Sequence, residues 1–379
     1  MQLLSSIWHL LSALLVLLMG AAVAYYAGAY FGLKRFRSLG IYGWHTIFCM
    51  VYLWYACLNG ADALDYYENA RIGIEEFGLG TEGVIFLTAV LIQWFDLSLL
   101  GVFLVFNISG LVGLIAFDGC LRLAVRTKPR NLKRLANLIV FLPSVSFWSS
   151  ALGKDALSFM AVGLALWAAM ALDRRWLLMS VSVLVMAFVR PHIAGMMVLA
   201  WTFSVLQNKN SLFFKKIILI CFVLGTAAIM VPFAIDYVGL AGKVNTSEFM
   251  DFVEQRQSYN QEGGGGIDIS TMSLPMQLLT YMFRPFVIEV DSFLSLAAAL
   301  ENLILTYIFL VGIFAVFKGC KSQLGESRTF IFSYIVLTWP LLAITTANLG
   351  IAIRQKWMFA PMLIFLLISI INTSKNRNI

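Results

Sequence analysis

Two clusters of charged residues interrupt apolar stretches of the sequence, and they are the first candidates for chemistry. The segment 141–157 contains Gly-Lys-Asp at 153–155 between apolar runs, and Arg-Pro-His at 190–192 interrupts a later run. Charges within apolar sequence are costly unless they face water, a partner or a ligand. We therefore expect both interruptions to lie on the same side of a membrane and to face one cavity.

Cations at such positions favour an anionic ligand. Arginine suits phosphate because its planar guanidinium donates hydrogen bonds to two oxygens at once. A lipid-linked sugar diphosphate is a ligand of this kind, since its phosphates lie near the membrane surface while its isoprenoid chain lies in the bilayer. The candidates for binding the diphosphate and the sugar, with Trp148 as a stacking surface, are Lys154, Asp155, Arg190, Arg284, Arg354 and Trp148.

Two acids and a histidine are the candidates for proton transfer. Asp62 and Asp65 fall in an acidic loop, where a carboxylate can bind sugar hydroxyls or accept a proton from an acceptor hydroxyl. His192 can do the same because its charge changes near neutral pH. The five cysteines are scattered and form no metal-ligand spacing. We expect no metal site and no cofactor, and a divalent ion stays an open alternative.

Each candidate also has a purely structural explanation. Lys154 and Asp155 can neutralise each other at a tight turn, and Arg190 can extend its cation to the membrane interface. The other candidates can be solvated loop acids, a helix cap, lipid-headgroup contacts or part of an interfacial aromatic belt; they are Asp62, Asp65, His192, Arg284, Arg354 and Trp148.

The elements that must position these residues are membrane-spanning helices. The chain has 379 residues, of which 60% are hydrophobic and 12% charged. Repeated apolar runs in such a chain predict an all-α, polytopic transmembrane bundle with about eleven spans, including short broken helices. The formal charge of +7 needs no nucleic acid, because Lys and Arg gather in cytoplasmic loops. We predict a single integral membrane domain over residues 1–379.

The distribution of charge orients the predicted spans. Basic segments at 34–37 and 122–134 mark cytoplasmic loops, and the acidic loop 59–83 lies outside. The N-terminus is then periplasmic and the C-terminus cytoplasmic. Two alternatives stay open, a full span at 83–94 and a re-entrant hairpin at 135–172. The predicted spans are 7–31, 41–58, 97–117, 135–149, 156–172, 176–189, 193–206, 217–235, 293–317, 330–346 and 357–371.

Two of these spans and one loop have consequences for function. Spans 135–149 and 176–189 rise roughly 22 Å, less than the hydrocarbon core of about 30 Å, so their outer ends should lie in a recess. The outer loop 236–284 contains a glycine run at 263–266 and an apolar stretch at 274–283 that is typical of an interfacial segment. We expect this loop to act as a lid.

Several short motifs together resemble a known family. They are GADALDYY at 60–67, LPSVSFWSSALGKDAL at 142–157, VRPHIA at 189–194, MFRPF at 282–286 with ALEN at 299–302, and IRQKWMFAPML at 353–363. On these motifs the chain resembles the O-antigen-polymerase-like proteins of bacterial surface-polysaccharide loci. Those proteins are similar in architecture to the membrane glycosyltransferases of the GT-C superfamily, which use polyprenyl-linked donors.

The resemblance implies polymerisation of undecaprenyl-diphosphate-linked repeat units on the outer face of the bacterial inner membrane. By similarity, Arg190, Arg284 and Arg354 hold the diphosphate leaving group. An acid in the first external loop acts as a base or metal ligand, which corresponds to Asp62 or Asp65. The implied partners are the lipid-linked oligosaccharide, membrane lipids, and a chain-length regulator and flippase of the same pathway, with no nucleic acid.

Three other functions stay open at this stage. A ligase or single-sugar transferase would use the same donor but would yield a capped or single-unit glycan. A transporter or flippase would favour internal repeats and charges at mid-membrane, whereas the sequence shows no repeat and its unusual charges cluster on one face. A scaffold for a synthesis complex would not depend on any single recessed arginine.

Overall fold

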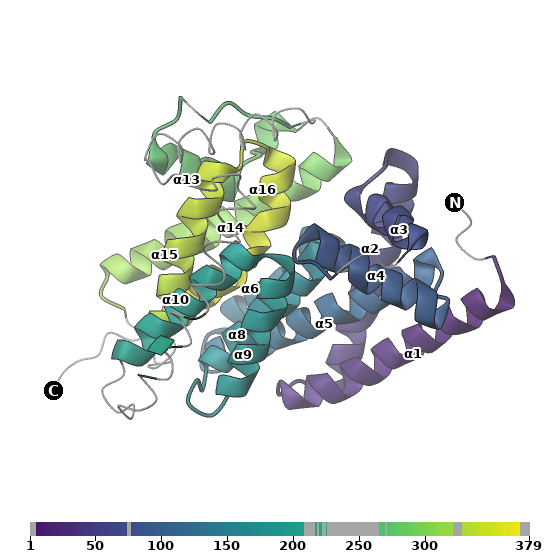
Figure 1. Ribbon diagram of the computed structural model, residues 1–379. Helices are drawn as coiled ribbons and strands as arrows, with labels where there is room; N and C mark the ends of the chain where they lie inside the picture. Colours follow the sequence, from purple (N-terminus) through teal and green to yellow (C-terminus); the bar gives the residue numbers. More distant parts are fainter. Residues whose placement is uncertain are drawn as a thin grey trace. The chain divides into compact units, whose positions relative to one another are not determined.

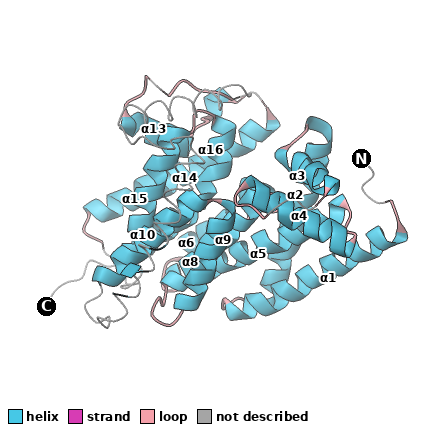
Figure 2. Ribbon diagram, in the orientation of Figure 1, coloured by secondary structure: helices cyan, strands magenta, loops and turns pink. Residues whose placement is uncertain are grey.

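Every regular element in the described part of this computed structural model is a helix (Figure 2). The structure describes residues 5–73, 77–207, 265–269, 271–290, 292–320 and 328–371, together with positions 217, 220, 221 and 225. The chain divides into two compact units, Met1–Arg190 and Pro191–Ile379. The all-α prediction is confirmed for the described residues. The single domain over 1–379 stays a prediction.

Several helices of the first unit begin or end at a proline or a glycine. Pro143 lies in the first turn of one helix, and Gly153, with φ of +152°, precedes the next in a conformation that favours glycine. The helices are α1 (Ile7–Tyr30), α2 (Arg35–Asn59), α3 (Asp62–Ile72), α4 (Thr81–Phe95), α5 (Leu99–Ala124), α6 (Arg130–Val140), α7 (Pro143–Ser149), α8 (Lys154–Ala169) and α9 (Trp176–Val189).

Helix α5 is the centre of the first unit. It packs against α1, α2 and α8, and α8 packs in turn against α9 (Figure 1). In its most apolar 18-residue window 72% of the residues are buried, against 28% in α1. Both helices are strongly apolar, so this difference means that α5 is surrounded by protein while most of the α1 surface is free to contact lipid.

Glycines allow the backbones of α5 and α8 to touch. A Cβ added at Gly163 on α8 would lie 2.3 Å from the carbonyl oxygen of Gly113 on α5. A Cβ at Gly113 would lie 2.6 Å from the carbonyl oxygen of Phe159. Small residues of this kind permit close helix packing in membranes, where association depends on van der Waals contact.

The second unit is also helical where it is described. Within it α10 packs against α15 (Figure 1). Helix α14 packs against α17, and α13 and α17 both pack against α15. Its elements are α10 (Pro191–Gln207), α13 (Leu274–Phe283), the 3₁₀ turn η1 (Val287–Glu289), α14 (Phe293–Phe317), α15 (Arg328–Thr345), α16 (Leu349–Gln355), the 3₁₀ turn η2 (Lys356–Met358) and α17 (Ala360–Ile370).

The number of membrane-spanning helices differs from the sequence prediction. Among the described residues, five helices are long and apolar enough to cross a membrane, namely α1, α2, α5, α14 and α15, and the pair α16–α17, bent by 62°, would be a sixth. These helices identify a membrane-embedded protein. They do not support eleven spans.

The discrepancy has a local cause. The predicted span 135–149 is divided between α6 and the seven-residue α7, and the next three predicted spans correspond to α8, α9 and α10, of 16, 14 and 17 residues. A helix needs about 20 residues to cross the hydrocarbon core. Most of the predicted span 217–235 lies outside the described residues.

The predicted lid lies largely outside the residues that the structure describes. Residues 236–264 are in this category, including the first half of the glycine run. The apolar stretch at 274–283 does form a helix, α13. The lid itself stays a prediction.

The close contact between α5 and α8 yields a stability prediction. Gly163→Ala should lower the free energy of unfolding by about 1–3 kcal/mol, because the new methyl group would overlap a backbone oxygen that cannot move independently. The measurement is the unfolding midpoint in detergent micelles. Gly43→Ala on α2 is the matched control, since a Cβ there meets nothing within 4 Å. Equal midpoints for the two variants would contradict the contact.

Candidate functional site

The structure brings the two charged interruptions together in the first unit. Arg190 Nη2 donates a hydrogen bond of 2.6 Å to Asp155 Oδ1, and Arg190 Nε donates one of 3.2 Å to Ser158 Oγ. The Arg190 side chain is 7% exposed and that of Asp155 is 15% exposed. Two residues separated by 35 positions in sequence therefore form a largely buried ion pair.

Helix ends position both members of this pair. Asp155 lies in the first turn of α8, where the helix dipole favours an anion, and Arg190 caps the C-terminus of α9, where the dipole favours a cation. Pro191 disfavours a helical conformation at the residue before it, so α9 stops at this point. The sequence Arg-Pro thus places the guanidinium at a helix end and not within a helix.

Lys154 extends the site to a third helix. Its Nζ donates a hydrogen bond of 2.9 Å to Thr81 Oγ1, in the first residue of α4. The backbone nitrogen of Gly80 donates to the carbonyl oxygen of Phe188 on α9 at 2.8 Å. The starts of α4 and α8 and the end of α9 are therefore joined by polar contacts. Because Asp155 pairs with Arg190, a Lys154–Asp155 pair is not needed to explain the buried carboxylate.

The candidate acids lie on a neighbouring helix. Asp62 and Asp65 belong to the first turn of α3, where the helix dipole favours acids. Tyr66 of the same helix is buried in one hydrophobic cluster with Leu152 and Val189. Helix α3 packs mainly against α4, and a Cβ at Gly153, just before α8, would lie 3.6 Å from the Tyr66 ring. The candidate acids therefore belong to a helix close to the start of α8.

Trp148 is part of an aromatic cluster on α7 and α2. Its ring lies 5.0 Å from that of Phe147 and 5.8 Å from that of Tyr52, both in edge-to-face geometry. The side chain is half-buried. These contacts account for the position of the indole without a sugar, and sugar stacking at Trp148 stays a prediction.

The second unit contains a separate polar centre around Lys356. This lysine is fully buried and donates a hydrogen bond to Asn302 Oδ1. Asn302 Nδ2 donates one of 3.1 Å to the carbonyl oxygen of Pro285, and neighbouring Glu301 is 2% exposed. Segments 282–286, 299–302 and 353–363, each part of the family resemblance, therefore meet in space.

Arg284 lies next to this centre in sequence and carries its own counter-ion. Its Nε and Nη2 donate to the two carboxylate oxygens of Glu289 at 3.1 and 2.5 Å, and the backbone nitrogen of Phe286 donates to the same carboxylate at 2.8 Å. The hydrogen bond from Arg284 holds the pKa of Glu289 below its usual value. Glu289 is therefore an internal partner that a ligand at Arg284 would have to displace or share.

The remaining candidates also belong to the second unit. Arg354 is half-buried in the last turn of α16, and His192 is exposed in the first turn of α10. The candidates are therefore divided between two units. That they all face one cavity stays a prediction.

Four polar residues of these centres were absent from the predicted site. Ser158 and Thr81 bond Arg190 and Lys154, and Asn302 bonds Lys356. Serine and threonine within apolar runs are too common to be noticed from sequence. Lys356 was detectable, because it follows Arg354 by two positions in an otherwise apolar C-terminal segment.

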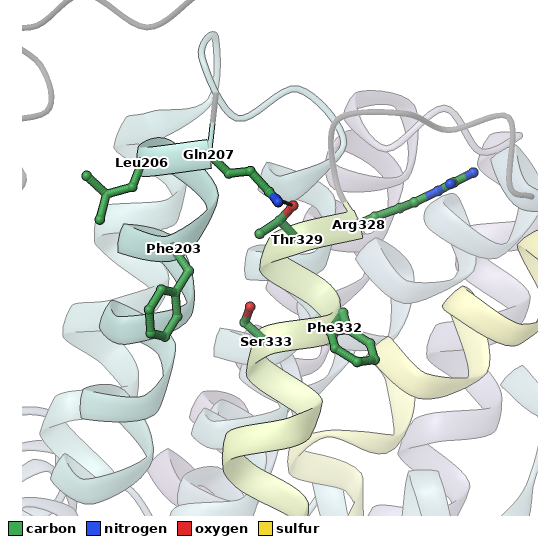
Figure 3. Close-up of a pocket in the computed structure, with 7 residues that line it drawn as sticks. All are labelled: Phe203, Leu206, Gln207, Arg328, Thr329, Phe332 and Ser333. Atoms are coloured by element: carbon green, nitrogen blue, oxygen red, sulfur yellow. Dashed lines mark hydrogen bonds between the residues drawn. The ribbon is translucent and has the colours of Figure 1, made fainter. Parts of the chain in front are cut away.

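The groove in Figure 3 lies between α10 and α15 of the second unit. It is open and has a volume of about 810 Å³. Thr329 donates a hydrogen bond across it to Gln207, while Arg328 points away from α10. Its lining residues are Phe203, Leu206, Gln207, Arg328, Thr329, Phe332 and Ser333. None of the predicted site residues lines it.

Comparison with known proteins gives no assignment. No family model matches the chain, and no curated protein and no solved structure matches it. Within the described ranges, no three His, Cys, Asp or Glu side chains are grouped so that they could hold a metal ion.

The buried ion pair makes a quantitative prediction. Asp155→Asn and Arg190→Gln should each lower the free energy of unfolding by about 3–5 kcal/mol, because each leaves a buried charge without its partner. The double variant should cost clearly less than the sum. Denaturant unfolding of the four proteins in micelles measures this.

An exposed pair provides the control for that cycle. Arg71 and Glu68 are 3.4 Å apart, with side chains 57% and 46% exposed. Arg71→Gln should cost about 0–1 kcal/mol. Strict additivity of the Asp155 and Arg190 changes would show that their contact contributes no coupling energy.

The Arg284–Glu289 pair predicts an acid-sensitive contribution to stability. Because the pKa of Glu289 is lower in the folded state, its stabilising effect is complete above the unfolded value of about 4.3 and is lost as the pH falls through the folded pKa. Glu289→Gln should therefore lower the unfolding midpoint at pH 7 and reduce its decrease between about pH 5 and 3. Parallel pH profiles for wild type and variant would contradict this.

Proposed function

We propose that this protein is a membrane glycosyltransferase that polymerises oligosaccharide repeat units carried on undecaprenyl diphosphate. The reaction takes place on the outer face of the bacterial inner membrane, with the N-terminus periplasmic and the C-terminus cytoplasmic. The motifs that resemble O-antigen-polymerase-like proteins support this proposal, and so does the way in which those motifs gather buried cations.

The single observation that carries the proposal is the setting of Arg190. Its Nε and Nη2 are held by Ser158 and Asp155, so the plane of the guanidinium is fixed before any ligand binds. Its Nη1 has no hydrogen-bond partner in the described part of the chain. A guanidinium that is already oriented and has one unused N–H donor is suited to bind a phosphate oxygen through a hydrogen bond.

The chemistry assigned to these residues is a single displacement. The hydroxyl oxygen of the acceptor glycan forms a bond to the anomeric carbon of the donor as the bond from that carbon to the diphosphate oxygen breaks. Asp62 or Asp65, or else His192, accepts the hydroxyl proton. The negative charge that develops on the departing undecaprenyl diphosphate is stabilised by Arg190, with Arg284 and Arg354 as further cations.

A structural role for the arginines is the competing hypothesis. Arg190 and Arg284 both pair with internal carboxylates, as expected for cations that only compensate buried acids. The two hypotheses differ for Arg190→Lys. Lysine keeps the charge needed by Asp155 but loses the planar pair of donors that phosphate recognition requires.

Surface-polysaccharide profiles in cells test the proposal. In a strain that lacks the chromosomal gene, wild type should restore a ladder of long chains. Arg190→Lys and Arg190→Ala should lower polymer synthesis about 10²–10³-fold, since each removes a donor to the leaving group. Arg174→Ala, which removes an exposed arginine, is the control and should leave the ladder unchanged.

The amount of each variant in the membrane and its unfolding midpoint separate loss of function from loss of fold. A normal ladder from well-folded Arg190→Lys and Arg190→Ala would overturn the phosphate-binding role. A capped single unit as the normal product would indicate a ligase or single-sugar transferase. Lipid-linked units trapped on the inner leaflet of the deletion strain would indicate a flippase.

A further inference from the structure

Helix α6 carries an unusual concentration of positive charge. No Asp or Glu occurs between residues 119 and 154, whereas residues 122–134 are rich in Arg and Lys. Leu132, Ala136 and Ile139 of α6 are buried, so the helix packs one apolar face against the protein. The cations of this basic surface are Arg122, Arg126, Arg130, Lys133 and Arg134, all of them exposed.

A buried carboxylate holds α6 against the rest of the first unit. Asp118 on α5 is 1% exposed and accepts hydrogen bonds from Arg37 Nε at 2.6 Å and Nη2 at 2.8 Å. The Nη1 of Arg37 donates to Asn137 Oδ1 on α6 at 2.6 Å. One arginine of α2 thus connects α5 to α6 and sets which face of α6 is exposed.

Most of the basic surface has no ion-pair partner among the described residues. Arg122 Nε lies 3.2 Å from Asp118, which already pairs with Arg37. The other four cations, Arg126, Arg130, Lys133 and Arg134, form no ion pair with any residue that the structure describes. These uncompensated charges, close together in sequence, produce a local positive field that attracts anions.

The location of this surface favours a lipid as the anion. Helix α5 has 26 residues and is apolar enough to cross a membrane, and the basic residues follow directly at its end. Leu123 and Leu138 are also exposed, at 40% and 48%. Exposed leucines beside clustered cations are typical of a short helix that lies in the plane of the membrane interface.

We propose that α6 and the segment before it form a binding surface for anionic lipid headgroups, with phosphatidylglycerol as the representative ligand. The cations contact headgroup phosphates, and the exposed leucines contact the acyl region. A basic segment next to a membrane span attracts anionic lipid in this way. This role does not depend on the glycosyl-transfer proposal, because it involves none of the residues assigned to that reaction.

Lipid binding to the full-length protein tests the surface directly. Protein purified in a neutral detergent is titrated with phosphatidylglycerol or phosphatidylcholine, and bound lipids are counted by native mass spectrometry. Wild type should prefer phosphatidylglycerol by at least about tenfold. The variant Arg130→Gln/Lys133→Gln/Arg134→Gln should bind phosphatidylglycerol about 10–100-fold more weakly and phosphatidylcholine as before.

A matched variant separates this surface from overall charge. Lys34→Gln/Arg174→Gln/Lys318→Gln also removes three exposed cations, but these are dispersed along the chain. It should retain the phosphatidylglycerol preference. Equal loss in both triple variants, or no loss in the α6 variant, would overturn the proposal.

Two further measurements show whether the α6 variant is folded and which kind of anion the surface binds. The α6 variant should unfold at the wild-type midpoint in phosphatidylcholine micelles, because its three altered side chains are exposed. Inorganic phosphate, compared with chloride at the same ionic strength, should not stabilise the wild type. Phosphatidylglycerol should raise the unfolding midpoint of the wild type. An equal rise with inorganic phosphate would assign the surface to a soluble anion and would also overturn the proposal.

Discussion

The backbone contact between α5 and α8 is the constraint on which the first unit depends. Both helices are apolar, and a hydrophobic effect cannot drive their association inside a membrane, so close van der Waals contact must do so. Gly113 and Gly163 make that contact possible. Because α9 then packs on α8, the start of α8 and the end of α9 are brought to the same place, and Asp155 reaches Arg190.

Buried charge is the second organising feature, and three buried charged side chains each have a polar partner. Asp118 is paired with Arg37, Asp155 with Arg190, and Lys356 is hydrogen-bonded to Asn302. Such pairs cost desolvation energy and add little net stability, but loss of one partner is expensive. They therefore restrict which helix packings are tolerated. At Arg190, whose Nη1 forms no hydrogen bond with the described residues, we propose that this structural restriction is combined with anion binding.

The two polar regions at opposite ends of α5 have different chemistry. Near its start, α3, α4, α8 and α9 gather a few buried or half-buried charges with fixed partners, which suits selective recognition of one ligand. Beyond its end, α6 displays several exposed cations without ion-pair partners among the described residues, which suits weak and repeated contact with headgroups. The proposed function would use both, since a lipid-linked substrate must be held and the protein must keep its position in the bilayer.

The sequence alone determined that the chain is helical and membrane-embedded, and it located the charged interruptions at 153–155 and 190–192, because hydropathy and charge are local properties of the sequence. It also identified Asp155 and Arg190 as unusual. Only the tertiary structure decided that these two residues pair, that Lys356 reaches Asn302, and that residues 130–140 form a surface helix and not part of a span. Hydropathy cannot make these distinctions, because apolar residues facing lipid and apolar residues facing protein have the same composition.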